Sequence, residues 1–283
     1  MSQTFDPRVT PIRPDLAGSE LRGLVGAPRY VESRAMQVVE ASAPLRREPR
    51  PDAPLETEAL FGEIVAVYEE DEGWAWAQLA RDRYVGYLPV SALSPPGAPP
   101  THRIAAIRTH AYPAASIKLP PVMALSLGAC VAVRAFDGDF AIAEGGAHLW
   151  ARHLAEVHTR EGDFVAVAER YLNAPYLWGG RTSEGIDCSG LVQSALTASG
   201  VSAQRDSDMM ERALGEPVSD QGALVRGDLI FWKGHIGVMR DAETLLHASG
   251  WHMAVVSERL EAARNRILSA GGGPVTSVRR FMR

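Results

Sequence analysis

Short runs of alternating apolar and polar residues fill the first half of the chain. Three of them follow one another closely, at residues 61–68, 74–79 and 84–89, with a few turn residues between them. Strands that are this short and this evenly spaced predict a small β-barrel. A proline-rich stretch at 94–100 reads as a linker, and a weaker copy of the strand pattern follows at 102–158. The first half therefore predicts two small barrels in succession.

The last part of the chain has a different pattern. Apolar residues recur at the 3.6-residue period over 191–196, so we expect a helix that begins near Cys188. Two apolar runs, 228–232 and 236–239, are joined by the turn Lys233-Gly234 and predict a β-hairpin. A helical half followed by antiparallel strands is typical of an α+β domain.

These patterns divide the chain into several domains, which agrees with a length of 283 residues, long for a single core. We expect a lead segment, a first barrel, a second barrel and an α+β domain, at residues 1–34, 35–95, 102–158 and 162–283.

Composition and charge narrow the function classes. Hydrophobic residues make up 46% of the chain and charged residues 22%, as in an ordinary soluble globular protein. The net charge is −5 without a long basic run, so we expect neither a nucleic-acid partner nor an anionic membrane surface. The first residues lack the pattern of a secretory signal, and no apolar run approaches the roughly 20 residues of a membrane span. We therefore expect a cytoplasmic protein; the sequence does not indicate its oligomeric state.

The chain has only two cysteines, Cys130 and Cys188. They form no disulfide framework, and we do not expect them to pair because they lie in different predicted domains. Cys188 is expected in the first turn of its helix, where backbone N–H groups stabilise a thiolate. A lone cysteine is more often a small buried hydrophobic residue. The small and polar neighbours in residues 185–190 favour a nucleophile instead.

A cysteine nucleophile needs a base and a group that orients the base. His235 follows the turn of the predicted hairpin, and His247 lies on a further apolar strand. We interpret His235 as the base and His247 as the group that fixes its tautomer. The alternatives are a solvated surface His235 and a core His247 with a satisfied hydrogen bond. The histidines and cysteines have no zinc-type spacing, so we expect no metal and no cofactor.

Four motifs carry a resemblance to a known family: residues 187–192, 226–232, 234–238 and 246–248. In this order and spacing they resemble the NlpC/P60 cysteine peptidases, and the strands at 61–89 resemble a bacterial SH3 domain. The resemblance implies an α+β fold in which a papain-like NlpC/P60 catalytic domain follows two small SH3-like β-barrels. It also implies cleavage of bacterial cell-wall peptides, commonly between D-γ-glutamate and a diamino acid.

The same resemblance implies roles for single residues. Cys188 is similar to the family's nucleophile, His235 to its base and His247 to the third, polar member of the set. Further residues match substrate-binding positions: Tyr176 near the nucleophile, Trp178 as an aromatic wall, Asp187 holding the free amine of an N-terminal L-alanine, and Ser189 and Ser207 along the pocket. Simpler roles stay open, with Asp187 as a helix cap, Ser207 in a turn, and the two aromatic residues in the core. His252 is assigned no role.

In relatives that recycle wall fragments, an SH3-like domain closes one end of the cleft. Glu63, Tyr84 and Tyr87 are the candidates for that contact, with barrel packing or a surface position as the alternative. The leading hypothesis is a cytoplasmic cysteine endopeptidase that acts on free L-Ala-γ-D-Glu-diamino-acid peptides during murein recycling. The alternatives are a catalytically inactive wall-binding protein and a papain-like amidase or acyltransferase.

Overall fold

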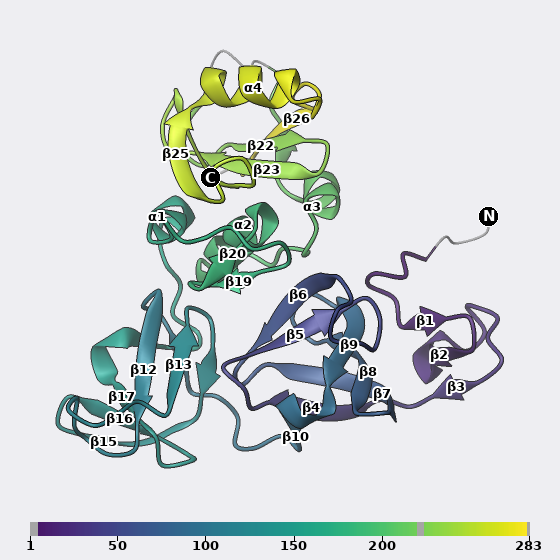
Figure 1. The fold of residues 1–283 in the computed structure, drawn as a ribbon, viewed down its shortest axis with the longest axis vertical. Helices are drawn as coiled ribbons and strands as arrows, with labels where there is room; N and C mark the ends of the chain where they lie inside the picture. The colour runs from purple at the N-terminus through teal and green to yellow at the C-terminus, as the bar shows by residue number, and fades with distance from the viewer. Residues whose placement is uncertain (1–4, 220–223, 282–283) are drawn as a thin grey trace. The chain divides into compact units, whose positions relative to one another are not determined.

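The computed structural model describes residues 5–219 and 224–281 (Figure 1). The chain divides into two compact units, Met1–His158 and Thr159–Arg283. Strands and short turns build the first unit, whereas the second combines helices with a mixed-order antiparallel sheet. Among the described residues, no helix has the length and apolar character that crossing a membrane requires.

The first unit begins with a small sheet near the N-terminus. Its strands are β1 (Ile12–Arg13), β2 (Leu16–Gly18) and β3 (Tyr30–Val31), with the 3-10 turn η1 (Ser19–Leu21) after β2. β1 pairs with β2 in antiparallel fashion, and β2 pairs with β3 in parallel. Leu16 is buried with Tyr68 and Trp76 of the sheet that follows. Apolar burial therefore anchors the lead segment on that sheet.

An antiparallel SH3-like sheet follows, in the order β10-β4-β7-β8-β9-β5-β6. Its members are β4 (Arg34–Val38), β5 (Ser42–Arg46), β6 (Leu55–Leu60), β7 (Ile64–Asp71), β8 (Trp74–Leu79), β9 (Val85–Pro89) and β10 (Leu93–Ser94), with the 3-10 turn η2 (Val90–Ala92) before β10. The alternating runs of the sequence are β7, β8 and β9, which lie side by side. Within the described residues no pairing joins β10 to β6, so the hydrogen-bonded strand order does not close on itself.

The alternating pattern of the sequence follows from the two faces of this sheet. Val65 and Val67 of β7 are buried in one core with Ala75 and Ala77 of β8. Trp76, between the two alanines, points to the opposite face, where it packs with Tyr68 under the lead segment. Both faces of β8 are therefore in use, one for the core and one for contacts with residues near the N-terminus.

The segment expected as a second barrel forms two small sheets, in the orders β14-β11-β18 and β13-β12-β17-β16-β15. The strands are β11 (His102–Ile104), β12 (Arg108–Tyr112), β13 (Met123–Ser126), β14 (Cys130–Val131), β15 (Val133–Asp137), β16 (Phe140–Ala143), β17 (His148–Trp150) and β18 (Leu154–Glu156), with the 3-10 turn η3 (Ala151–His153). Ile104, Leu125 and Leu149 form their core, and Leu60 of β6 joins it. The SH3-like sheet and these two small sheets thus share buried apolar surface, and an SH3-like character of the second segment stays a prediction.

The second unit combines helices with one larger sheet. The helices are α1 (Phe164–Glu169), α2 (Cys188–Ala198), α3 (Ser207–Ala213) and α4 (Leu260–Ser269). The sheet runs in the order β21-β26-β22-β23-β24-β25, with β21 (Glu216–Pro217), β22 (Leu229–Trp232), β23 (His235–Met239), β24 (Thr244–Ser249), β25 (Ala254–Arg259) and β26 (Ser277–Arg280). A separate short hairpin precedes α2, with strands β19 (Arg181–Thr182) and β20 (Gly185–Ile186).

Helix packing on this sheet positions the residues of interest. α2 packs on β23 and β24, whereas α4 packs on β24 and β25 from the other side (Figure 1). The predicted hairpin is confirmed, because Trp232 pairs with His235 across the Lys233-Gly234 turn. Gly234 has a φ of 74°, a left-handed conformation that glycine adopts without steric cost. The start of α2 and the start of β23 are thereby brought together.

Candidate active site

Cys188 is the first residue of α2, as the sequence predicts. Its side chain is buried, with 7% of the residue exposed. The thiol lies within hydrogen-bonding reach of the backbone N–H of Ile236, the residue after His235, and of the N–H of Ser189. This contact places the sulfur beside the first residues of β23. A nucleophile candidate and a base candidate therefore share one site.

His235 and His247 are joined directly. Nε2 of His235 lies 2.7 Å from Nδ1 of His247, and the ring centroids are 5.0 Å apart. Between them in the sheet, a Cβ at Gly237 would lie 2.7 Å from the Leu245 side chain and 3.2 Å from the His247 Cβ, so glycine leaves room for both residues. Trp232 packs against the His235 ring at a centroid distance of 5.6 Å. The predicted contact between the two histidine rings is thus present, and their role in catalysis stays a prediction.

Glu258 and Arg266 extend this chain, and the sequence did not identify either residue. Oε1 of Glu258 lies 2.8 Å from Nε2 of His247. Arg266, on α4, donates to both carboxylate oxygens at 2.6 and 2.5 Å. Burial opposes ionisation, but the hydrogen bonds from His247 and Arg266 lower the pKa of Glu258 to about 2. Glu258 is therefore an anion at neutral pH and can accept a hydrogen bond from a protonated ring nitrogen of His247.

The anionic Glu258 determines the tautomers of both rings. Because it only accepts hydrogen bonds, His247 carries its proton on Nε2 and presents an unprotonated Nδ1. The Nε2–H of His235 must then donate to that Nδ1. His235 retains an unprotonated Nδ1, the nitrogen that can accept a proton from a thiol. The sequence holds one weak signal for Glu258. If the strands around His247 and Val256 pair, Glu258 lies two positions beyond Val256 and therefore on the same face as His247.

Burial controls the resting protonation of the site. Burial and then the Asp187 charge raise the pKa of the Cys188 thiol to about 12, although the N–H groups of Ile236 and Ser189 lower it. Burial lowers the pKa of His235 to about 3, and the proximity of His247 and Arg266 adds to this shift. The N–H groups at the helix start do lower the pKa of the thiol, but the effect of burial is larger. Burial outweighs the helix dipole, so the neutral thiol and the neutral imidazole are the favoured forms.

Asp187 is enclosed by hydrogen-bond donors. As the N-cap of α2, it accepts a hydrogen bond from the N–H of Gly190 at 2.7 Å. Arg205, which is 1% exposed, donates to both carboxylate oxygens at 3.0 and 2.7 Å. The Gly179 N–H and the Ser189 hydroxyl add contacts at 2.8 and 3.3 Å. The helix-cap interpretation is confirmed. An ammonium group would have to share these occupied oxygens, so amine binding by Asp187 stays a prediction.

The other predicted substrate-binding residues differ in their burial and in their contacts with the residues around Cys188. Tyr176 lies close to the thiol, and burial raises the pKa of its hydroxyl, with a smaller contribution from the neighbouring Cys188 and Asp187. Ser189 is buried and also accepts from Arg205 at 2.7 Å. Trp178 is 64% exposed, so the core alternative is wrong for it. Ser207 begins α3 in a half-buried position. Within the described residues no hydrogen bond links Ser207 to Cys188 or its neighbours.

The SH3-like candidates lie in the first unit. Tyr84 is buried in the core of the sheet, and its hydroxyl contacts Glu56 at 3.3 Å. Glu63 accepts a hydrogen bond from the Leu60 N–H at 3.1 Å and pairs with Arg81. For these two residues the packing alternative is the one observed. Tyr87 instead lines a pocket on the outer face of β8 and β9.

One group of side chains has the composition of a metal site. Ligand atoms of His247, His252 and Glu258 all lie within 4.8 Å of one another. Glu258 already pairs with Arg266, so a cation there would meet a guanidinium group at hydrogen-bonding distance from the same carboxylate. We therefore assign these residues no metal-binding role.

Comparisons with known proteins identify two domain types in the chain. Residues 173–269 match the model of the NlpC/P60 family, and residues 45–93 match that of the bacterial dipeptidyl-peptidase SH3 domain. Dipeptidyl-peptidase 6 of Lysinibacillus sphaericus is 36% identical over 101 residues, which cover 35% of this chain and 36% of that protein. Gamma-D-glutamyl-L-lysine dipeptidyl-peptidase of Bacillus subtilis is 36% identical over 95 residues, or 30% of this chain and 31% of that one.

The matched region therefore spans about a third of the length of these curated relatives. A solved NlpC/P60 family protein from Bacillus cereus superposes with a TM-score of 0.74. The superposition covers 88% of this chain and all of that one at 18% identity, so it shows a shared fold. The carboxyl-terminal domain of this chain is a member of the NlpC/P60 family, and a bacterial SH3 domain precedes it.

Proposed function

We propose that the chain is a cysteine peptidase that hydrolyses cell-wall peptides between D-γ-glutamate and a diamino acid. The observation that carries the proposal is the hydrogen-bonded chain from Glu258 through His247 to His235, which ends beside the buried thiol of Cys188. The family of the domain and the names of its relatives support a hydrolase of peptidoglycan peptides.

In the proposed first step, a neutral pair becomes reactive when substrate arrives. Cys188 transfers its thiol proton to Nδ1 of His235 while the sulfur attacks the carbonyl carbon of the γ-D-glutamyl amide. His235 then carries a positive charge, which the chain through His247 to the anionic Glu258 stabilises. Because both partners start neutral, charge develops only in the transition state, where these contacts are stronger than in the ground state.

The oxyanion of the tetrahedral intermediate needs donors of its own. As the first residue of α2, Cys188 has a backbone N–H outside the i→i−4 hydrogen bonds of the helix. We assign this N–H and the Tyr176 hydroxyl, whose pKa is raised so that it stays protonated, as the oxyanion donors. Collapse of the intermediate returns the proton from His235 to the leaving amine and leaves a thioester, which water hydrolyses with His235 as base.

For the substrate, we propose a short peptide with a free amino end, L-Ala-γ-D-Glu-diamino acid. The name of the Bacillus subtilis relative, a gamma-D-glutamyl-L-lysine dipeptidyl-peptidase, supports this choice, since a dipeptidyl-peptidase releases a dipeptide from an amino end. Asp187, Ser189, Ser207 and Trp178 stay the proposed substrate contacts. Action on free peptides would fit murein recycling in the cytoplasm.

The test is mass spectrometry of L-Ala-γ-D-Glu-diaminopimelate after incubation with the chain. We expect release of L-Ala-γ-D-Glu by the wild type and by Cys130→Ala, which removes the other cysteine, but not by Cys188→Ala. An N-acetylated copy of the peptide should be spared if a free amine is required. Equal cleavage of both copies would contradict the amine requirement alone. Turnover by Cys188→Ala, or none by the wild type, would contradict the peptidase proposal.

A further inference from the structure

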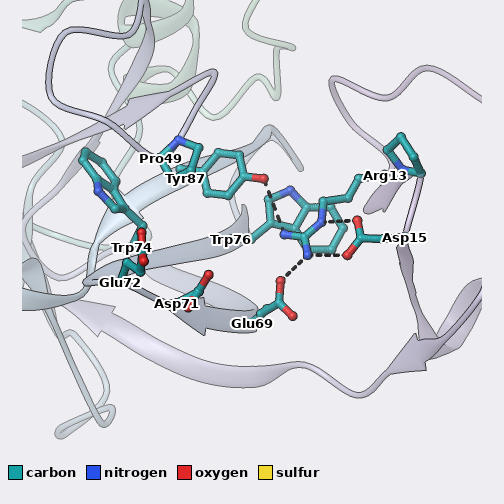
Figure 2. A pocket seen from close by; sticks show the side chains of 10 residues that line it. Arg13, Asp15, Pro49, Glu69, Asp71, Glu72, Trp74, Trp76 and Tyr87 are labelled. Atoms are coloured by element: carbon teal, nitrogen blue, oxygen red, sulfur yellow. Dashed lines mark hydrogen bonds and ion pairs between the residues drawn. The ribbon is translucent and has the colours of Figure 1, made fainter.

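A pocket of about 420 Å³ lies in the first unit, and none of its lining residues belongs to the candidate active site (Figure 2). It is formed between the lead segment and the outer face of strands β7, β8 and β9. The residues that line it are Arg13, Pro14, Asp15, Pro49, Glu69, Asp71, Glu72, Trp74, Trp76 and Tyr87. Its volume falls in the range of about 300–1,000 Å³ that is typical of ligand sites.

Strand register builds this surface from two neighbouring acid–indole pairs. Glu69 of β7 stands opposite Trp76 of β8, and Asp71 stands opposite Trp74. Residues two positions apart on a strand share a face, so both pairs point into the same pocket. Tyr87 of β9 stands on the far side of Trp76 and extends the first pair. Each pair offers an aromatic face beside a carboxylate.

The chain itself fills the first pair with a cation. The guanidinium carbon of Arg13 lies 4.8 Å from the centre of the Trp76 ring. The same group pairs with Glu69 and donates to the Tyr87 hydroxyl at 3.4 Å, as Figure 2 shows. Asp15 holds it from the other side with two bonds of 2.8 Å. An acid–indole pair of this kind therefore binds a positive charge at the end of an alkyl stem.

The second pair has no such occupant. Within the described part of the chain, no hydrogen bond or ion pair joins Asp71 or Glu72 to another side chain, and both residues are exposed. Trp74 is half-buried, and Pro49 forms the facing wall of the pocket (Figure 2). Two carboxylates and an indole face thus line a part of the pocket in which the described residues supply no positive charge. The neighbouring pair, Glu69 and Trp76, receives its positive charge from Arg13.

We propose that Asp71, Glu72 and Trp74 bind the cationic side chain of a peptide ligand, of the lysine or arginine type. The alkyl stem would pack on the Trp74 indole, and the charged end would pair with the carboxylates, as Arg13 does at the neighbouring pair. Charge complementarity selects this occupant over a neutral or anionic one. The site would hold a ligand on the SH3 domain independently of the peptidase chemistry.

The experiment records the indole N–H signals of the full chain by NMR during titration with model side chains. The probes are Nα-acetyl-lysine methylamide, Nα-acetyl-arginine methylamide and, as the uncharged match for the stem, Nα-acetyl-norleucine methylamide. Trp74→Phe identifies the Trp74 signal. We expect a saturable shift of that signal with the two cationic probes, weaker binding as salt is added, and no saturable shift with norleucine.

Two variants remove charge without disturbing the strand. Glu72 has a φ of 44° in the two-residue turn Glu72-Gly73, a conformation that asparagine tolerates better, so Glu72→Asn should keep the turn. Asp71→Asn is isosteric. Each should weaken binding of the cationic probes at least about threefold. Glu70→Gln is the matched control, because Glu70 points to the other face of the strand and pairs with Arg34. This variant should bind the cationic probes with the affinity of the wild type.

The outcomes separate clearly. Norleucine binding as tight as that of lysine would overturn the proposal, and so would full affinity in the two asparagine variants. A cationic probe that shifts other indole signals but not that of Trp74 would place the site elsewhere. Running the titration on Cys188→Ala keeps the result independent of the proposed peptidase function, since an inactive chain should bind the probes equally well.

Discussion

At the scale of single residues, the site depends on the balance between burial and local dipoles. The start of α2 offers N–H groups to the Cys188 sulfur, yet the pKa of the thiol is raised to about 12 because the group is buried. His235 is shifted in the opposite direction, to about 3. Both shifts favour the neutral forms, so the proposed nucleophile is generated by proton transfer during the reaction rather than stored beforehand.

The resting state can be read from thiol alkylation. In Cys130→Ala, where Cys188 is the remaining thiol, the rate of reaction with iodoacetamide should rise about tenfold per pH unit between roughly pH 6 and pH 9. The reason is that the thiolate fraction grows in this proportion below a pKa of about 12. A stored thiolate–imidazolium pair would instead give a nearly constant rate over this range, and that result would contradict the neutral resting pair.

At the scale of elements, the site is held by a link between a strand and a helix. Glu258 belongs to β25 and Arg266 to α4, and their paired hydrogen bonds of 2.6 and 2.5 Å connect the two elements next to His247. α4 thereby does more than cover the sheet. It stabilises the charge on Glu258, and Glu258 in turn determines which nitrogen of His247 carries the proton.

Glu258→Gln should slow the reaction without weakening substrate binding. An amide lacks the negative charge that stabilises the imidazolium and can also donate to His247, which reverses the tautomers. We expect kcat to fall about 100-fold while KM changes little. The higher kcat of the wild type should persist from about pH 4 upward, because Glu258, whose pKa is lowered to about 2, stays ionised there. The measurement is a pH profile of both kinetic constants.

The matched control for this variant is Glu261→Gln, a change in the first turn of α4 at an exposed glutamate that pairs with Arg264. Its kinetics should equal those of the wild type. If Glu258→Gln raised KM and left kcat unchanged, Glu258 would act on the binding pocket rather than on the histidines.

At the scale of the whole molecule, the buried cores follow the division into two units. The core around Trp232 draws its residues from 218–278, whereas the cores of the first unit draw theirs from 9–154. Residues 158–160, where the units meet in sequence, are exposed. Each unit therefore has the means to fold by itself.

Limited digestion with trypsin should accordingly yield a resistant fragment that begins at Glu161. Arg160 is exposed at the boundary, and cleavage after it breaks no strand or helix. Mass spectrometry over a time course identifies the fragment, and Arg160→Gln should suppress it. Degradation of the second unit before the fragment accumulates would argue that this unit is not stable alone.

Local sequence was enough to predict the elements and the main candidates. The 3.6-residue period placed the start of α2 at Cys188, and the Lys233-Gly234 turn placed His235 on a hairpin. Asp187 was recognisable as a cap from its position before the helix. These features depend on contacts between residues close in sequence, where periodicity and turn chemistry carry the information.

Tertiary structure alone decided the features that depend on distant residues. Arg205 occupies the Asp187 carboxylate from a loop 18 positions later, and Arg266 reaches Glu258 from a helix that packs across the sheet. The neutral thiol follows from burial, and the acid–indole pairs follow from the register between β7 and β8. The sequence by itself determined which reactive groups the chain carries and the elements that hold them. Folding decided their charges and partners, because both depend on which segments pack together.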